Sequence, residues 1–265
     1  MKILIVTLCH KYKIFLIVAI GHKFFYFCRM DTRELLENGN QYFLPNLSID
    51  IVIIGYKDNK LYSLLLKTGE KWLLPGSYIK NDESVEEAAI NILETRTGCK
   101  DAYLKFLAVY GDKDRQFKAM MKEIFFGIGM EWEEGYWINK RFVSLTYYSL
   151  VNIENTHPKL RDFDEAFDWF DFQDLPDMWL DHKDITITAL NQLRIDIQHE
   201  HNAYNLLPEV FTMPELYQLH QTILGKEIDR SRFQKRILAT GLFERLPKLY
   251  KKSPGRNPFQ YRVKR

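Results

Sequence analysis

Cysteine is scarce in this chain of 265 residues, which has only Cys9, Cys28 and Cys99. An odd number of cysteines at no metal-ligand spacing predicts neither a disulfide framework nor a zinc site. The sequence also has no internal repeat, no low-complexity tract and no apolar run near the roughly 20 residues that a membrane-spanning helix needs. These absences favour a globular protein of the reducing cytoplasm, with no metal ion, no cofactor and no membrane partner.

Acidic residues are absent from the first 29 positions, which are otherwise apolar and basic. Two apolar runs, ILIVTLC and IFLIVAIG, are separated there by HKYK, and no small-residue cleavage pattern follows them. This arrangement disfavours a secretory signal peptide. We expect residues 1–29 to be a mispredicted extension and translation to begin at Met30, with a membrane anchor as the alternative.

Positive charge gathers at the C-terminal end. From Asn205 to Arg265 the chain has 13 lysines and arginines against 5 acidic residues, a net charge of +8, whereas the whole chain has a net charge of +2. An acidic body with a basic C-terminal module indicates either a polyanion-binding appendage or a solvated basic surface.

The body, residues 45–200, combines helix and strand signals. The runs IDIVIIGY and LYSLLLK flank KDNK, which predicts a β-hairpin. Ser84 and Glu87 match the S-x-x-E capping box of a helix that ends at Gly98. A further helix is expected from near Asp184 to about His199, and HEHNAYNLLP after it is expected to be a linker. The predicted fold class is α+β, with helices packed on a mixed sheet.

The C-terminal module, residues 206–265, predicts a winged helix-turn-helix. Thr212 and Glu215 form a capping box, Gly225 stands at a helix end, and Asp229 caps a second helix. The β-like pieces LFERL and FQYRV follow, joined by a segment rich in turn signals. A helix, a short turn, a basic helix and a β-hairpin make up the winged-helix pattern.

The second helix of this module is amphipathic. Phe233, Ile237 and Leu238 share one side, and basic residues cluster on the other. A basic helix in the major groove with a basic wing on the phosphates predicts binding to double-stranded DNA. The alternative for Arg230 is packing at the helix start. The residues expected to contact DNA are Arg230, Ser231, Arg232, Lys235, Arg236, Lys251, Lys252 and Arg256.

Residues 76–99 resemble the Nudix box, a motif written G-x5-E-x7-R-E-U-x-E-E-x-G-U with U aliphatic. Anchored on Glu83 and Gly98, its spacing fits this sequence without a gap. The two glutamates that hold the metal in active members fall on Thr95 and Arg96. Because Mg²⁺ is bound through carboxylates, the sequence predicts a Nudix frame without its metal site and without catalytic residues.

A Nudix-like domain followed by a basic winged helix is the layout of the Nudix-related transcriptional regulators, which include the NAD-metabolism repressor NrtR and an arabinose regulator. The resemblance runs from about Leu47 to the C-terminus and is most specific in LLPEVFTMPELYQLHQTILGKEIDRSRFQKRILATGL. It implies a homodimer that binds palindromic operator DNA and a small-molecule effector, a pentose or an ADP-ribose-like compound. The expected function is ligand-responsive control of sugar (pentose) or related catabolic genes.

The effector site is expected where aromatic faces and polar side chains meet. Aromatic rings stack on sugars or bases, and Asp and Arg side chains bond hydroxyls or phosphates. The alternative is that the aromatic residues pack in the core and the charged residues form a solvated loop. Residues 116–139 depart from the family pattern, either to alter ligand specificity or as extra packing. The expected effector residues are Trp72, Tyr78, Asp112, Asp114, Arg115 and Arg141.

Two other functions remain open at the sequence level. One is a Nudix hydrolase that acts on a nucleoside-diphosphate derivative and has a nucleic-acid-binding tail, with substitute ligands among Glu83, Glu86, Glu87 and Glu94. The other is a sensor whose basic module docks on a protein partner. His199 and His201 do not share a helix face, which disfavours a metal site, and no Ser, His and Asp constellation is recognisable.

Overall fold

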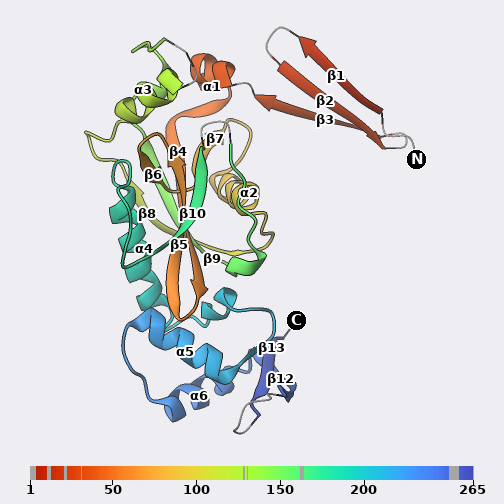
Figure 1. Ribbon diagram of the computed structural model, residues 1–265, viewed down its shortest axis with the longest axis vertical. Helices are drawn as coiled ribbons and strands as arrows, with labels where there is room; N and C mark the ends of the chain where they lie inside the picture. Colours follow the sequence, from red (N-terminus) through yellow and green to blue (C-terminus); the bar gives the residue numbers. More distant parts are fainter. Residues whose placement is uncertain are drawn as a thin grey trace.

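The computed structural model describes residues 4–10, 13–20, 23–30, 32–127, 129, 131–161, 164–250 and 257–264. Three antiparallel strands come first, β1 (Leu4–His10), β2 (Lys13–Ile20) and β3 (Lys23–Met30). Helix α1 (Thr32–Asn38) and the 3₁₀ turn η1 (Gly39–Gln41) follow. In Figure 1 this small sheet lies apart from the rest of the molecule.

A seven-stranded mixed sheet forms the body. The strand order is β10-β5-β4-β9-β8, with β6 beside β5 and β7 beside β4, and only β4 and β9 pair in parallel. The strands are β4 (Phe43–Lys57), β5 (Lys60–Thr68), β6 (Lys71–Leu73), β7 (Gly76–Lys80), β8 (Tyr103–Tyr110), β9 (Val143–Leu150) and β10 (Ala166–Asp171). The turn η3 (Ile153–Asn155) follows β9.

The predicted hairpin is confirmed, because β4 and β5 pair as antiparallel neighbours up to Lys57 and Lys60. The two residues between them, Asp58 and Asn59, have positive φ angles of 48° and 59°. Asx residues tolerate this left-handed backbone, and two such residues in sequence match the twist of a tight hairpin.

Two helices cover the opposite faces of the sheet (Figure 1). They are α2 (Val85–Thr97) and α4 (His182–Asp196). Side chains alternate along a strand, so Ile49, Ile51 and Ile53 of β4 join the core under α2, and the intervening Val52 and Ile54 join the core under α4. Ser48 and Asp50, which lie in register with Val52, are therefore on the α4 side.

The predicted ends of α2 are confirmed. The Ser84 side chain accepts a hydrogen bond from the Glu87 N–H, the Glu87 carboxylate accepts one from the Ser84 N–H, and Gly98 ends the helix with a φ of 72°. The other helix of the body differs slightly from expectation, since α4 begins at His182 and ends at Asp196. The Tyr148 hydroxyl donates to Asp196 at 2.5 Å, which fixes the end of α4 on the sheet.

The described part of the segment 116–139 adds a small packed unit to the body. It contains α3 (Lys118–Gly127) and the 3₁₀ turn η2 (Trp137–Asn139). Met121, Phe125 and Trp137 are buried there in a third apolar cluster, which also takes in Trp179. The Trp137 indole N–H donates to the Leu35 carbonyl at 2.8 Å, so this unit is also tied to α1.

The C-terminal region has the predicted winged-helix architecture, with the strand order β11-β13-β12. Thr212 and Glu215 form the expected capping box, Gly225 is left-handed, and Asp229 accepts a hydrogen bond from the Arg232 N–H. The elements are β11 (Phe211–Thr212), α5 (Met213–Leu224), α6 (Arg230–Ala239), β12 (Phe243–Lys248) and β13 (Phe259–Val263).

The segment expected to be a linker is instead partly buried. It forms the turn η4 (Ala203–Leu206), and Asn202, Ala203 and Leu206 are each at most 6% exposed. Its apolar side chains belong to one cluster that runs from the α4 face of the sheet to Leu219 of α5 and Phe233 of α6. The body and the winged helix therefore share a core. Within the described ranges, no helix is long and apolar enough to cross a membrane.

Candidate effector cavity and DNA-binding face

A cavity of about 340 Å³ is lined by residues of β4, β7 and α3, by the end of α2, by the start of α4 and by Arg161 and Asp164. Its volume is at the lower end of the range for small-molecule sites. The segment 116–139 supplies much of its apolar wall, through Phe117, Met120, Met121, Ile124 and Ile138. This segment, whose role the sequence left open, therefore helps to shape the cavity.

The first polar part of the wall centres on Asp50, which is 6% exposed. Arg115 donates to the Asp50 carboxylate at 3.0 Å, and its Nε donates to both oxygens of Asp181 at 3.1 and 3.0 Å. The Ser144 hydroxyl also donates to Asp50. The positive charge of Arg115 is thus shared by the carboxylates of Asp50 and Asp181, so this group of three side chains has a net negative charge.

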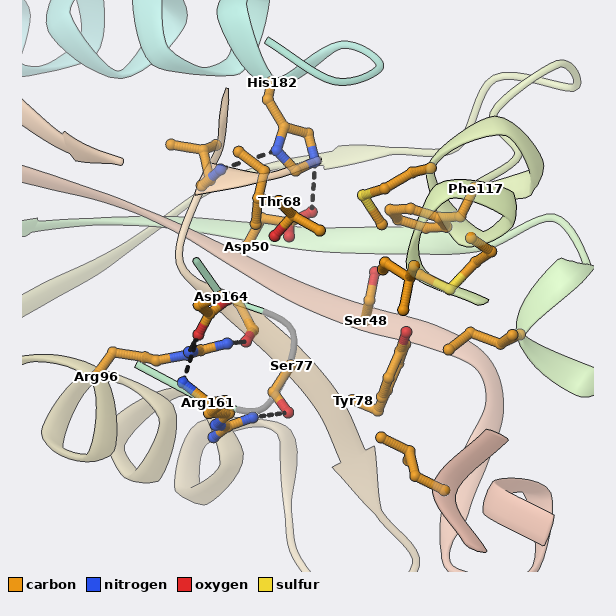
Figure 2. Close-up of a pocket in the computed structure, with 18 of the residues that line it drawn as sticks. Ser48, Asp50, Thr68, Ser77, Tyr78, Arg96, Phe117, Arg161, Asp164 and His182 are labelled. Atoms are coloured by element: carbon orange, nitrogen blue, oxygen red, sulfur yellow. Dashed lines mark hydrogen bonds and ion pairs between the residues drawn. The ribbon is translucent and has the colours of Figure 1, made fainter. Parts of the chain in front are cut away.

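His182, the first residue of α4, faces Asp50 across this part of the cavity (Figure 2). Its Nδ1 accepts a hydrogen bond from the Leu74 N–H at 3.0 Å, so the ring proton of the neutral imidazole is on Nε2. Nε2 is 3.9 Å from the Asp50 carboxylate, which is too long for a hydrogen bond. Burial lowers the pKa of His182, which keeps the ring neutral.

A second polar part of the wall contains two arginines (Figure 2). Arg96 forms a buried ion pair with Asp164 and donates to the Gly76 carbonyl at 3.2 Å. Arg161 donates to the Ser77 hydroxyl at 2.8 Å. The guanidinium groups of these residues make this part of the wall the one suited to an anionic group.

Tyr78 is the only expected effector residue that lines this cavity. Its ring lies 4.9 Å from the ring of Trp137 and 5.4 Å from that of Phe142. Burial raises the pKa of Tyr78, and the Asp50 charge adds to this effect, so the phenol stays protonated and can donate a hydrogen bond.

The other expected effector residues lie elsewhere. Arg115 is 3% exposed and sits behind the wall, where it holds Asp50. Trp72 packs edge-on against Phe170 with ring centroids 4.5 Å apart. Asp112, Asp114 and Arg141 are exposed, and the Arg141 guanidinium donates to the Gly111 carbonyl. None of these five residues lines the cavity, so their contact with an effector stays a prediction.

The Nudix-box positions have structural partners in this chain. The Glu83 carboxylate accepts hydrogen bonds from the Lys80 N–H at 2.9 Å and from the Asn91 amide at 3.1 Å. Thr95 is exposed, and the Arg96 guanidinium forms an ion pair with the Asp164 carboxylate. Within the described residues, no three His, Cys, Asp or Glu side chains are grouped so as to hold a metal ion.

Helix α6 presents a basic face to solvent. Phe233 and Ile237 are 4% and 1% exposed and pack inward. The expectation that Leu238 also packs inward is wrong, because this residue is 45% exposed. Consecutive residues of a helix point in different directions, so Leu238 faces solvent although its neighbour Ile237 is buried. The expected DNA-contacting residues of α6 that are exposed are Arg230, Ser231, Arg232, Lys235 and Arg236.

Individual members of this basic face differ in their surroundings. The Arg230 guanidinium lies over the Tyr217 ring at 5.9 Å, in keeping with the alternative that it packs at the helix start.

In the wing, Lys251, Lys252 and Arg256 lie outside the described residues. The described wing strand β12 carries two further cations that were not among the expected DNA-contacting residues, Arg245 and Lys248, which lie 4.1 and 5.2 Å from the centre of the Phe259 ring.

Helix α4 connects the cavity to the winged helix. It begins with His182 in the cavity wall, and near its other end Arg194 donates to the Ile223 carbonyl in the last turn of α5 at 3.0 Å. A polar network holds the same end on the sheet, because Lys105 pairs with Asp196 at 3.0 Å. Burial and the hydrogen bond to Asp196 raise the pKa of Tyr148, so this network keeps a protonated phenol.

Residues 203–263 match the model of the NrtR DNA-binding winged helix domain. Over 82% of its length the chain is similar to the ADPR responsive transcriptional repressor NtrR of Acinetobacter baylyi, with 22% identity and 80% of the relative covered.

Solved structures give the same result for the fold. NrtR of Shewanella oneidensis, complexed with a 27mer DNA, superposes with a TM-score of 0.66 and 23% identity over 82% of this chain and 93% of that one. A MutT/nudix family protein of Enterococcus faecalis superposes with a TM-score of 0.60 and 21% identity, over 83% and 86% of the two chains. The chain is therefore similar to the Nudix-related regulators, with a Nudix-like α+β body followed by a winged helix domain of the NrtR type.

Proposed function

We propose that this protein is a ligand-responsive transcriptional regulator of the cytoplasm, in which the Nudix-like body senses a small molecule and the winged helix binds operator DNA. The observation that carries the proposal is the exposed basic face of α6, opposite the buried Phe233 and Ile237, within a region that matches a DNA-binding domain. A helix of this kind is suited to the major groove.

The proposed effector is an ADP-ribose-like compound or a pentose. An ADP-ribose-responsive relative supports the first choice. The cavity supports both, since it combines an arginine-bearing part, suited to phosphates, with a part around Asp50 that is suited to hydroxyls. We include in the proposal that the regulated genes serve sugar (pentose) or related catabolism.

The body is proposed to sense its ligand without hydrolysing it. Arg96 stands where the Nudix box carries a metal-binding glutamate, and its ion pair with Asp164 is buried. A guanidinium at this position repels Mg²⁺, and the exposed Thr95 beside it is a poor ligand. Pyrophosphate hydrolysis of the Nudix kind depends on that ion.

The proposed signal travels along α4. A ligand that contacts His182 alters the start of this helix, and Arg194 near its other end holds the last turn of α5. We propose a homodimer in which this movement changes the relative orientation of the two winged helices. Their spacing then no longer matches half-sites about one helical turn apart. Effector and operator must in that case weaken or strengthen each other's binding by the same factor.

The test is a titration of the full chain against DNA upstream of its own gene and of neighbouring genes, at several salt concentrations, with and without ADP-ribose, L-arabinose and D-ribose. We expect sequence-selective, salt-dependent binding that one of these compounds changes by at least about fivefold. Magnesium-dependent turnover of ADP-ribose is measured on the same sample. Binding that ignores sequence, or rapid turnover, would contradict the proposal and favour a protein-docking module or a hydrolase.

A further inference from the structure

A second cavity, of about 350 Å³, lies between α6 and the end of α4. Ile197 and Gln198, the first two residues after α4, both line it. Lys226, which is in the turn between α5 and α6, lines it together with Arg232 and Arg236 of α6. We refer to this cavity as the basic pocket. The last helix of the body and the helix expected to bind DNA thus share one cavity.

The two arginines of the basic pocket lie on the flank of α6. A helix turns by about 100° per residue, so Lys235, two residues after the buried Phe233, projects almost opposite to it. Arg236, three residues after Phe233, projects on the same side as the packed face, about 60° from it. Arg232 is four residues before Arg236 and therefore lies on the same flank. Lys235 is then the residue that points straight out from α6.

The basic pocket carries an excess of positive charge. Among the described residues that line it, Lys226, Arg232 and Arg236 are accompanied by one carboxylate, that of Asp229. This carboxylate caps α6, where it accepts a hydrogen bond from the Arg232 N–H at 2.6 Å. None of the three cations forms an ion pair with another described residue. A concave site of this charge concentrates a positive potential, which favours a bound anion.

The surroundings of the basic pocket match a phosphate of duplex DNA. Gln198, Lys226 and both arginines are exposed, so a phosphate within a long polymer can reach them. A helix in the major groove has a phosphate backbone on each side, and cations on its flank therefore meet phosphates rather than base edges. Guanidinium groups bind phosphate oxygens through paired hydrogen bonds.

Gln198 brings the body into this site. Its amide Nε2 donates one N–H to the Arg194 carbonyl at 2.9 Å, which holds the side chain on the last turn of α4. The amide has a second N–H that can donate to a phosphate oxygen. Helix α4 ends at the winged helix (Figure 1), where Arg194 donates to the Ile223 carbonyl, and the next residue, Leu224, lines the basic pocket. A shift of α4 therefore changes the pocket itself.

Resting on the proposed function, we infer that the basic pocket binds one phosphate of the operator backbone, between α6 and the end of α4. Lys226, Arg232 and Arg236 supply the positive charge, and Gln198 donates a hydrogen bond. The body is then part of the DNA-binding surface. A ligand that moves α4 changes this phosphate contact directly, within a single subunit and in addition to the proposed reorientation of the two winged helices.

The test is fluorescence anisotropy of the full chain with the operator and with a random duplex of the same length, at several salt concentrations. The variants are K226Q, which removes a charge, and Q198A, which removes an amide. The matched controls are K57Q and Q218A, because Lys57 and Gln218 are exposed and line a different cavity beside α5. Thermal unfolding of each variant checks that the fold is unchanged.

We expect K226Q to weaken binding of both duplexes by the same factor and to reduce the slope of log affinity against log salt by about 0.9. Q198A should weaken binding of both duplexes by about fivefold without altering the slope, because the lost side chain is neutral. K57Q and Q218A should bind like the wild type.

Operators with one neutral methylphosphonate linkage identify the phosphate. At one linkage in each half-site, the losses caused by K226Q and by the neutral linkage should not add, because both remove part of the same contact. At the other linkages the two losses should add.

Two results would overturn the inference. One is operator binding by K226Q and Q198A that equals the binding by their controls. The other is a loss in K226Q that adds to the loss at every neutral linkage. If the wild type binds the operator selectively in the same experiments, the proposed function stands and only the basic pocket is rejected. Failure of the wild type to bind selectively would reject both.

Discussion

Arg96 and Asp164 form an ion pair whose side chains are only 7% and 5% exposed. Arg96 occupies a position that the Nudix box, by resemblance, assigns to a metal-binding glutamate, and it also donates to the Gly76 carbonyl at 3.2 Å. A side-chain cation therefore sits where an active Nudix protein positions a ligand for a metal cation. Arg96 thereby links the end of α2 to the first residue of β7.

Replacing Arg96 by methionine should destabilise the fold, because it leaves the Asp164 carboxylate buried without its partner. We expect the free energy of unfolding in urea to fall by about 3–5 kcal/mol. The double variant R96M/D164L should recover most of that loss, since two apolar side chains then replace the pair. A loss below about 1 kcal/mol in R96M would show that Asp164 does not depend on Arg96.

The basic face of α6 should account for the salt dependence of DNA binding. Arg232 and Lys235 are exposed there, so R232A and K235A should each weaken operator binding. A residue that contacts a phosphate should also reduce the slope of log affinity against log salt by about 0.9. The measurement is fluorescence anisotropy at several salt concentrations. K113A, which removes an exposed lysine of the body, should leave affinity and slope unchanged, and equal losses in K113A would refute a localised interface.

The link between cavity and winged helix should depend on Arg194. Its hydrogen bond to the Ile223 carbonyl is 3.0 Å long and joins α4 to α5. In the R194Q variant we expect effector affinity without DNA to stay within about twofold of the wild type, while the effect of effector on operator affinity falls at least about fivefold. The matched control is K183Q, which removes an exposed charge at the other end of α4. Undiminished coupling in R194Q would place the connection elsewhere.

His220 should make stability depend on pH. It is 1% exposed, its ring lies 4.8 Å from that of Phe233, and burial, helped by the nearby Arg236 and His201, lowers the pKa of His220 to about 4. The unfolded chain takes up this proton below an ordinary pKa of 6.5, whereas the folded chain does so only below about 4. The stability contribution is therefore complete above pH 6.5 and is lost as the pH falls from 6.5 to about 4.

Between about pH 7 and about pH 5, His220 should account for about 2 kcal/mol of the decrease in unfolding free energy. The H220L variant, which cannot take up this proton, should show a decrease smaller by that amount. Denaturant titrations at both pH values measure the difference. Identical decreases in the two proteins would mean that His220 is protonated equally in both states.

Helices whose ends are set by local chemistry were predictable from the sequence. Ser84 with Glu87 and Thr212 with Glu215 are caps within four consecutive residues, so a short stretch of sequence carries the whole interaction. The hairpin at Asp58 and Asn59 is equally local. The winged helix followed from the order of such signals, and the Nudix-like body from the resemblance of residues 76–99 to the Nudix box.

The cavity was harder to predict because its parts come from distant segments. Asp50 is on β4 and His182 begins α4, and only the folded sheet brings them together. Exposed polar residues of loops, such as Asp112 and Asp114, were expected to bind the effector because loops commonly bind ligands. The useful signal was the strand itself, where Ser48 and Asp50 are polar at alternate positions of an otherwise apolar run.

The apolar cluster shared by α4, η4, α5 and α6 bears on how this architecture can be recombined. Leu193, Leu206 and Leu219, each at most 1% exposed, would lose their cover if the chain were cut between the two regions. A winged helix excised at residue 206 would expose that surface and tend to aggregate. Exchange of sensor domains between relatives should therefore succeed only when α4 is transferred together with the winged helix. The unit that can be exchanged as a whole thus includes α4 and is larger than the winged-helix domain alone.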